Sequence, residues 1–184
     1  CTRLRLKAGS VVSTIFMMGI FIPTVLCVVP IFLQMRKAGL IDRHLGVILL
    51  SIAVNLPFTV YVLCGVFRTM PHELEEAATI DGCNYFQIFW RIMLPLARGG
   101  IATVSIFNFL SVWNEYVLTK SVIMMPAKNT LPVGLVNLQA TTNSQADWGA
   151  LFAGMVIIMI PTLIIYLIFQ KYITSGLTAG AVKG

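Results

Sequence analysis

Acidic side chains gather at one place in the chain and are the first candidates for chemistry. Four of the seven Asp and Glu residues lie close together: Glu73, Glu75, Glu76 and Asp81. Grouped carboxylates act as general acids, bases or metal ligands when other polar groups join them. The only two histidines, His44 and His72, fall in different loops, and we find no metal-ligand cluster, phosphate loop or nucleophile–base pair. The sequence therefore predicts a charged surface rather than an enzyme, with no metal and no cofactor.

The composition indicates a membrane environment. The 184 residues are 58% hydrophobic and 11% charged, whereas a soluble domain carries about 25% charged residues. The net charge of +6 sits at the borders of apolar blocks, as in membrane anchoring by Lys and Arg. A nucleic-acid site would gather basic residues on one face, so we predict no nucleic-acid partner. The four cysteines show no paired spacing and fit small buried hydrophobes.

Four apolar blocks are each long enough to cross a membrane. A bilayer core of about 30 Å needs roughly 20 apolar residues in a helix. The blocks cover residues 11–35, 45–67, 99–119 and 148–170. Four such blocks in one short chain do not suit the alternative, a soluble protein with buried core helices. We predict an all-α membrane protein: a bundle of transmembrane helices in which Pro161 interrupts the fourth span.

The basic residues predict how the spans are oriented. Eight of the 13 Lys and Arg residues fall on the side that holds the loop of residues 68–98 and the two chain ends, and five fall on the other side. Cytoplasmic loops carry the excess of Lys and Arg. The loop of residues 68–98 is therefore expected in the cytoplasm.

The first part of this loop has the signals of a short helix. Pro71 suits a first turn, and the acids that follow it suit the positive end of the helix dipole. Gly82 is a typical stop, so we predict a helix over Pro71–Asp81. Leu74, Ala77 and Ala78 are spaced to share one face of it.

A second short helix is expected directly after it. Asn84 and Gln87 have the spacing of a capping box, and Pro95 is expected to end the helix before the third span. Its apolar side would consist of Phe86, Phe89, Trp90 and Met93. Two short helices joined at a glycine form a protrusion that another protein can grip. The alternative, a loop lying on lipid, conflicts with the acids, because anionic headgroups repel them.

The same loop carries a recognisable motif. Glu76-Ala77-Ala78, then Gly82, Ile92 and Leu94-Pro95, resembles in residues and spacing the EAA signature of permease subunits of ABC importers. Asp81 before Gly82 also looks like that family, whereas Cys83 stands where a smaller Ala or Ser is commoner. Three further segments resemble the carbohydrate-uptake branch, of the maltose and glycerol-phosphate type: Trp113-Asn114-Glu115, residues 130–135 and residues 176–184.

The resemblance implies a MetI-like permease domain over residues 1–184, in the bacterial cytoplasmic membrane. Six spans are usual in this branch, so the chain would lack its N-terminal spans. The implied partners are a cytoplasmic ABC ATPase dimer that hydrolyses ATP, a second permease subunit, an extracytoplasmic solute-binding protein, membrane lipid and a sugar-like solute. The residues implied in ATPase docking are Glu76, Ala77, Ala78, Asp81, Gly82, Leu94 and Pro95.

A second candidate site lies in the third predicted span. Glu115 is its only acid, and ionisable residues inside membranes are functional candidates. Together with Asn108, Trp113 and Asn114 it would line a translocation path, because aromatic and amide groups suit sugars. The alternative is that Trp113 and Glu115 are anchors at the outer interface near Lys120.

Two other functions remain open on the sequence. The first is an ABC importer permease for a polyamine, phosphate or an amino acid, since fold analogy does not name a substrate. The second is a channel or scaffold without an ATPase, which has no need for a docking protrusion. An integral membrane enzyme is a remote third option, because no catalytic pair is present.

Overall fold

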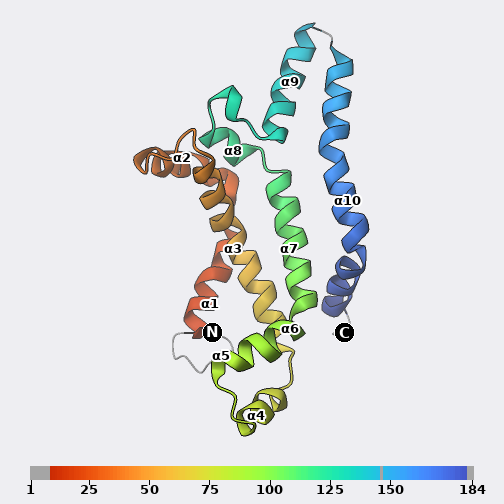
Figure 1. Ribbon diagram of the computed structural model, residues 1–184. Coiled ribbons are helices and arrows are strands. Elements are labelled where there is room, and N and C mark those ends of the chain that lie inside the picture. Colours follow the sequence, from red (N-terminus) through yellow and green to blue (C-terminus); the bar gives the residue numbers. More distant parts are fainter. Residues whose placement is uncertain (1–8, 146, 182–184) are drawn as a thin grey trace. The chain divides into compact units, whose positions relative to one another are not determined.

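The computed structural model describes residues 9–145 and 147–181, and within them the regular elements are helical (Figure 1). The predicted all-α class is confirmed. The principal helices are α1 (Gly9–Met18), α2 (Val28–Lys37), α3 (His44–Arg68), α4 (Glu73–Ile80), α5 (Tyr85–Ile88), α6 (Leu94–Leu96), α7 (Arg98–Trp113), α8 (Val117–Val122), α9 (Leu131–Gln145) and α10 (Trp148–Ala181). Arg3, Arg5, Lys7 and Lys183, which enter the orientation prediction, lie outside the described residues, as does the end of the 176–184 segment.

Two helices are by themselves long and apolar enough to cross a membrane, α3 and the Trp148–Gln170 part of α10. Up to four crossings result if each of two broken helix pairs is one span. Pro57 and Pro161 both lie inside these long helices. Pro161 therefore does not end α10 where an interruption of the fourth span was expected. Membrane helices tolerate the lost main-chain bond when neighbouring groups satisfy the freed carbonyl.

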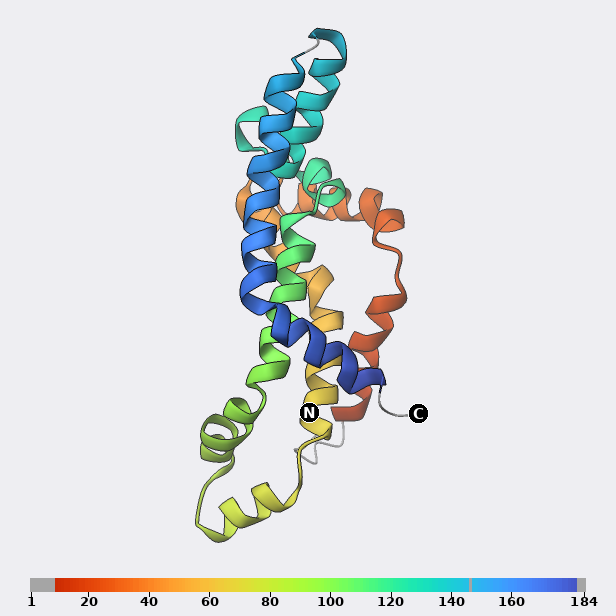
Figure 2. The same ribbon diagram turned by 90° about the vertical axis from the view of Figure 1, so that its right-hand side faces the viewer.

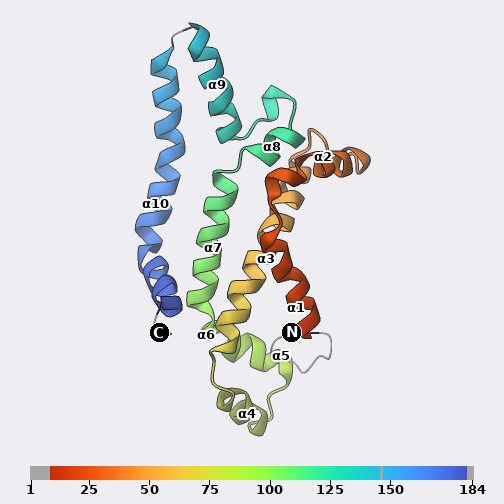
Figure 3. The same cartoon turned by 180° about the vertical axis from the view of Figure 1, so that it is seen from behind.

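The first apolar block is a broken helix rather than a continuous span. It consists of α1, two 3₁₀ turns and α2, and Pro23 between the turns has an extended backbone at φ −68° and ψ 106°. Extended backbone at this point interrupts the helical hydrogen bonds. α2 begins after the break and packs beside α8 (Figure 3).

The third apolar block differs from expectation at both ends. α7 ends at Trp113, and the chain turns through residues 114–116 before α8, so Glu115 lies in a connection and not in a membrane helix. At the other end Pro95 does not stop a helix but lies in α6, after a π-helical turn over Phe89–Met93. A proline is tolerated there because it occupies the first turn of α6, where a main-chain donor is not needed. The 70° bend occurs after Leu96 instead.

The described chain clusters into two compact units. One holds residues 9–21, 56–107 and 169–181, and its buried apolar centre is Ala78, Ile88 and Met93. The other holds residues 22–55 and 108–168, with Leu50, Leu118 and Val122 at its centre and α2 packed against them. Many apolar side chains on the long helices are exposed, as expected for surfaces that face lipid.

Within the first unit, α3 and α7 approach closely at a glycine. A Cβ atom on Gly100 would lie 3.0 Å from Cγ1 of Val66 and closer still to its Cγ2. A Cβ on the neighbouring Gly99 would meet nothing within 4 Å. Glycine at position 100 therefore sets the distance between the two helices.

We expect Gly100→Ala to lower the thermal unfolding midpoint of the detergent-solubilised protein. Forcing a methyl group against a β-branched side chain costs about 1–3 kcal/mol. Gly99→Ala is the matched control, because it makes the same change in helix propensity, worth up to about 1 kcal/mol in favour of folding. Equal midpoints for the two variants would show that the helices do not pack at Gly100.

Candidate functional site

Helix α4 of the loop is ended by a glycine in the left-handed region. Gly82 has φ +80°. Its N–H donates to the Thr79 carbonyl at 3.1 Å, and the N–H of Cys83 donates to the Ala78 carbonyl at 2.9 Å. These two bonds form a Schellman motif, which satisfies the last carbonyls of a helix. The helix begins at Glu73, two residues later than predicted, with its acids in the first turn.

Helix α5 begins with the predicted capping box, which is confirmed. The side chain of Asn84 accepts from the N–H of Gln87 at 2.9 Å, and the Gln87 side chain accepts from the N–H of Asn84 at 2.9 Å. Both main-chain donors are thereby satisfied at the start of the helix. The chain direction is fixed on both sides of the turn at Gly82.

The inner face of the loop has its own apolar core. Ala78 is only 4% exposed and packs with Ile88 and Met93. Partly buried side chains surround this cluster: Phe67, Met70, Cys83 and Ile92. The methyl group of Ala78 therefore belongs to the core of the loop, and its predicted part in ATPase docking stays a prediction. Leu94 and Pro95 are half-buried and belong to the base of the loop.

The outer face of α4 is exposed and partly apolar. Glu76, Ala77, Asp81 and Gly82 are all exposed, and Ile80 is 86% exposed. Ile80 is two residues after the buried Ala78 and four after Glu76, so Ile80 and Glu76 share the side of the helix opposite to the core. Ile80 is not among the residues predicted for docking, although its position four residues after Glu76 is visible in the sequence. Figure 2 shows α4 lying beyond the end of α3, joined to α5 by a short turn.

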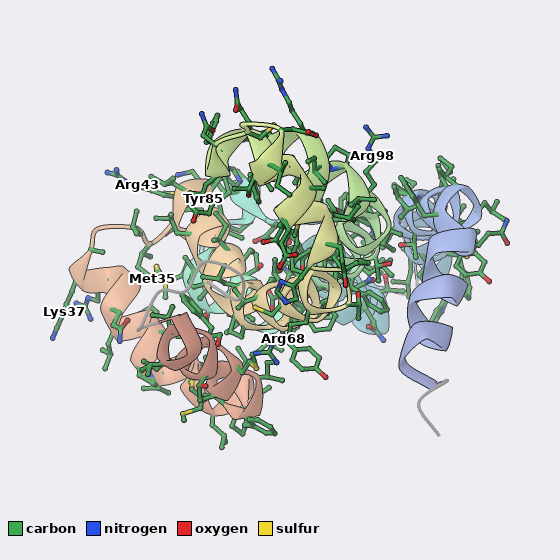
Figure 4. The ribbon with its side chains drawn as sticks, turned by 90° about the horizontal axis from the view of Figure 1, so that it is seen from below. Met35, Lys37, Arg43, Arg68, Tyr85 and Arg98 are labelled. Carbon is green, nitrogen blue, oxygen red and sulfur yellow. The ribbon has the colours of Figure 1, made fainter. Side chains whose placement is uncertain are left out.

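Three aromatic rings lie on α5 and on the π-helical turn that follows it. Phe86 and Trp90 have ring centroids 5.9 Å apart, and Phe89 and Trp90 are in edge contact at 5.6 Å. All three rings are exposed. The side chain of Arg98, at the start of α7, points away from that helix in Figure 4. This end of the unit thus presents acidic, aromatic and basic groups together.

The four residues proposed for a translocation path do not come together as one lining. Trp113 Nε1 donates to the Ile158 carbonyl of α10 at 3.1 Å, and its ring stacks on Phe109 at 5.6 Å. Asn114 Nδ2 donates to the Leu110 carbonyl at 2.8 Å. Asn108 is half-buried in α7. Trp113 thus joins α7 to α10, and its predicted roles as a path residue or as an anchor near Lys120 stay predictions.

Glu115 caps helix α8. Its two oxygens accept from the N–H of Leu118 at 2.7 Å, the N–H of Thr119 at 2.8 Å and the hydroxyl of Thr119 at 2.6 Å. A carboxylate at this position suits the helix N-terminus in both charge and hydrogen bonding. A cavity of about 20 Å³ beside it, lined also by Ser51 and Asn55, has room for about one water molecule. The structural role of Glu115 is therefore evident, whereas a role in transport has no support from its contacts.

A larger hollow lies in the second unit beside α9 and α10. Its volume is about 440 Å³, and its lining is mostly apolar, with Asn129, Thr130 and Asn137 as polar members. Binding pockets for small molecules are commonly of this size. In the described part of the chain, no group of three His, Cys, Asp or Glu side chains is placed to hold a metal ion.

Comparison with known proteins decides what kind of chain this is. Residues 2–179 match the family described as binding-protein-dependent transport system inner membrane component. The chain belongs to this family. It is therefore an inner-membrane permease chain of an ABC transporter, with helices that cross the membrane several times.

Individual relatives agree with this family. The permease is similar to the diacetylchitobiose uptake system permease protein NgcG of Streptomyces coelicolor, at 35% identity over 98% of this chain and 60% of the relative. It is also similar to the trehalose transport system permease protein SugB of Mycobacterium tuberculosis, at 38% identity over 88% of this chain and 59% of the relative. The chain thus spans less than two thirds of the length of these relatives.

A solved structure has the same fold. A chain of a bacterial ABC transporter involved in the import of the acidic polysaccharide alginate superposes with a TM-score of 0.71 at 29% identity. The match covers 93% of this permease and 64% of that chain. The helix order of the permease is therefore that of an ABC importer.

We expect Gly82→Val to loosen the turn between α4 and α5, while Gly82→Asn preserves it. Space does not limit either side chain, since a Cβ at this position meets nothing within 4 Å. The cost is conformational, about 1–2 kcal/mol for a residue forced into the left-handed region, and asparagine tolerates that region best. Hydrogen exchange of the amides at 79–83 measures the effect. Equal protection in both variants would contradict the role assigned to the positive φ.

Replacing Glu115 by alanine is expected to destabilise the start of α8. The loss of a capping side chain costs about 0.5–2 kcal/mol. Amide exchange at Leu118 and Thr119 should rise most in Glu115→Ala and less in Glu115→Gln, which keeps one acceptor oxygen. Lys120→Ala, an exposed change in the same helix, is the control. Unchanged exchange at both amides in Glu115→Ala would argue against the cap.

Proposed function

We propose that this permease is one membrane subunit of an ATP-driven importer that carries a sugar or related solute into the cell. The observation that carries the proposal is the exposed face of α4, where Ile80 and Glu76 lie outward from a loop with its own apolar core. Ile80 is 86% exposed, so its side chain is available for burial against a partner protein. The partner proposed is a cytoplasmic ABC ATPase dimer, which performs the ATP hydrolysis.

The construction of the loop supports a docking role. The Schellman motif and the capping box fix both ends of the turn at Gly82. The buried cluster around Ala78 joins α4 to Phe67 of α3 and to Ile88 and Met93, just before α7. A push on Ile80 is thereby transmitted to two helices of the bundle. Coupling of this kind requires contacts that differ between two states of the transporter.

The relatives favour a sugar as the solute. Their names include uptake systems for diacetylchitobiose, trehalose and galactooligosaccharides. The proposed path is alternating access, in which a pair of permease subunits rocks around a cavity near the midplane of the membrane. A second permease subunit and an extracytoplasmic solute-binding protein complete the proposed assembly, and the loop with α4 faces the cytoplasm.

Ile80→Asp tests the docking proposal directly. We expect recovery of the ATPase with the detergent-solubilised permease to fall at least about tenfold, since burying an isoleucine contributes about 1.5–3 kcal/mol. ATP-driven uptake in proteoliposomes should fall with it. The conservative change Ile80→Leu should retain both activities, and the unfolding midpoint should remain the same in both variants because Ile80 contributes nothing to the core. Full recovery of the ATPase with Ile80→Asp would reject α4 as the docking surface.

A further inference from the structure

Asp42 has an uncommon backbone conformation. It lies in the turn between α2 and α3 and has φ +56°, the one positive φ outside glycine among the described residues. Residues with a side chain rarely adopt this region, and Asn and Asp do so most readily. A conformation of this kind persists only where surrounding interactions hold it.

The hydrogen bonds that hold Asp42 reach the last residue of α8 and the segment after it. Its Oδ1 atom accepts from the N–H groups of Met124 and Met125, each at 2.7 Å. Its own N–H donates to the Val122 carbonyl at 2.9 Å, and its carbonyl accepts from Nζ of Lys128 at 2.7 Å. Asp42 thus makes four hydrogen bonds, through its side chain and its main chain, to four residues between positions 122 and 128.

The charge of Asp42 suits this arrangement. The hydrogen bonds from Met125 and Met124 are the main causes that lower the pKa of the Asp42 carboxyl below its ordinary value, and the positive charge of Lys128 acts in the same direction. The carboxylate is therefore ionised throughout the neutral range. Hydrogen bonds to an ionised acceptor are stronger than those between neutral groups.

The segment held by Asp42 continues directly into the hollow beside α9 and α10. Pro126, Asn129 and Thr130 belong to its lining. Asn129 Oδ1 and Thr130 Oγ1 are buried oxygens without a hydrogen-bond partner among the described residues. Burying such an oxygen without a partner costs about 1–3 kcal/mol, and other contacts of the segment must offset this cost.

We propose that Asp42 is a positioning residue whose carboxylate fastens the segment 123–130 to the α2–α3 turn, and so keeps this wall of the hollow formed before any ligand enters. The apolar cluster of Leu50, Leu118 and Val122 lies on the other side of the same turn and holds α2 and α8 independently of the carboxylate. Residues 124–127 of the wall are exposed, and the carbonyl of Lys128 lies 3.2 Å from Nε2 of His44, at the start of α3. This inference concerns the second unit alone and does not depend on the solute or on the ATPase.

Three substitutions of Asp42 distinguish the effect of its carboxylate from the effect of its backbone conformation. Asp42→Gly accepts the positive φ without strain but removes the acceptor. Asp42→Asn keeps an oxygen at the position of Oδ1, which alone takes both amide bonds, and also tolerates the conformation. Asp42→Ala removes the acceptor and retains the strain. If only the backbone conformation of Asp42 matters, the segment in Asp42→Gly will be as immobile as in the unmodified protein. If the hydrogen bonds of the side chain hold the segment, Asp42→Asn will keep it immobile and Asp42→Gly will not.

The experiment uses the assembled transporter in liposomes, with the native cysteines replaced. A nitroxide label on Ala127→Cys, an exposed position in the segment, reports its mobility, and a label on Arg36→Cys of α2 is the control. We expect narrow, mobile spectra at 127 with Asp42→Gly and Asp42→Ala, and immobile spectra with Asp42→Asn. The reaction of Asn129→Cys with a membrane-impermeant maleimide should accelerate roughly tenfold or more in the first two variants, because lost bonds to a charged group shift local opening by at least that factor.

A label at 127 that stays immobile in Asp42→Gly would overturn the proposal, and so would equal loosening at the control position 36. Neither readout requires ATP or solute. The expected spectra at position 127, together with full recovery of the ATPase by Ile80→Asp, would reject the docking proposal and leave the role of Asp42 intact.

Discussion

The need to satisfy main-chain N–H groups wherever a helix breaks governs the use of charge in this chain. Inside a bilayer no water replaces a lost helical bond. The three acidic residues outside the 73–81 cluster all meet this need. Asp42 accepts from Met124 and Met125, Glu115 from Leu118 and Thr119, and Asp147 from Ala150 at 3.1 Å. The carboxylates of Asp42, Glu115 and Asp147 thus accept hydrogen bonds from main-chain N–H groups, and Glu115, predicted as a path residue, has a structural role.

The acids of the α4 segment have a different position. Glu73, Glu76 and Asp81 are exposed. The C-terminal end of α4 is completed without them, because main-chain N–H groups make the Schellman bonds at Gly82. Their charge therefore remains available at the surface, beside the exposed Ile80. Glu73, Glu76 and Asp81 thus differ from Asp42, Glu115 and Asp147, which bind main-chain N–H groups, and this difference supports the proposed docking surface.

Local signals in the sequence predicted local structure well. The capping box of Asn84 and Gln87 and the stop at Gly82 are read from three or four neighbouring residues, and both are present. The breaks at Pro23 and after Trp113 were not predictable from hydropathy, because a window of apolar residues does not record a change of direction. The positions of the prolines did not predict the helix breaks either. Pro57 and Pro161 lie within helices, whereas Pro23 lies at a break. Whether a helix continues through proline depends on neighbouring helices, which only the fold supplies.

The sequence also did not predict which face of α4 is buried. Ala77 and Ala78 are equally small, yet one is exposed and the other is buried, because Ile88 and Met93 occupy the space beneath the helix. That burial gives the loop mechanical meaning. A helix without buried contacts would be free to rotate. In contrast, Ala78 of α4 packs on Ile88 and Met93, and their segment continues through α6 into α7. Phe67 and Met70 extend the same cluster to the end of α3, and Gly100 of α7 lies close to Val66 of α3. In the proposed docking, a force on α4 would therefore reach the ends of both helices, because close-packed side chains transmit strain.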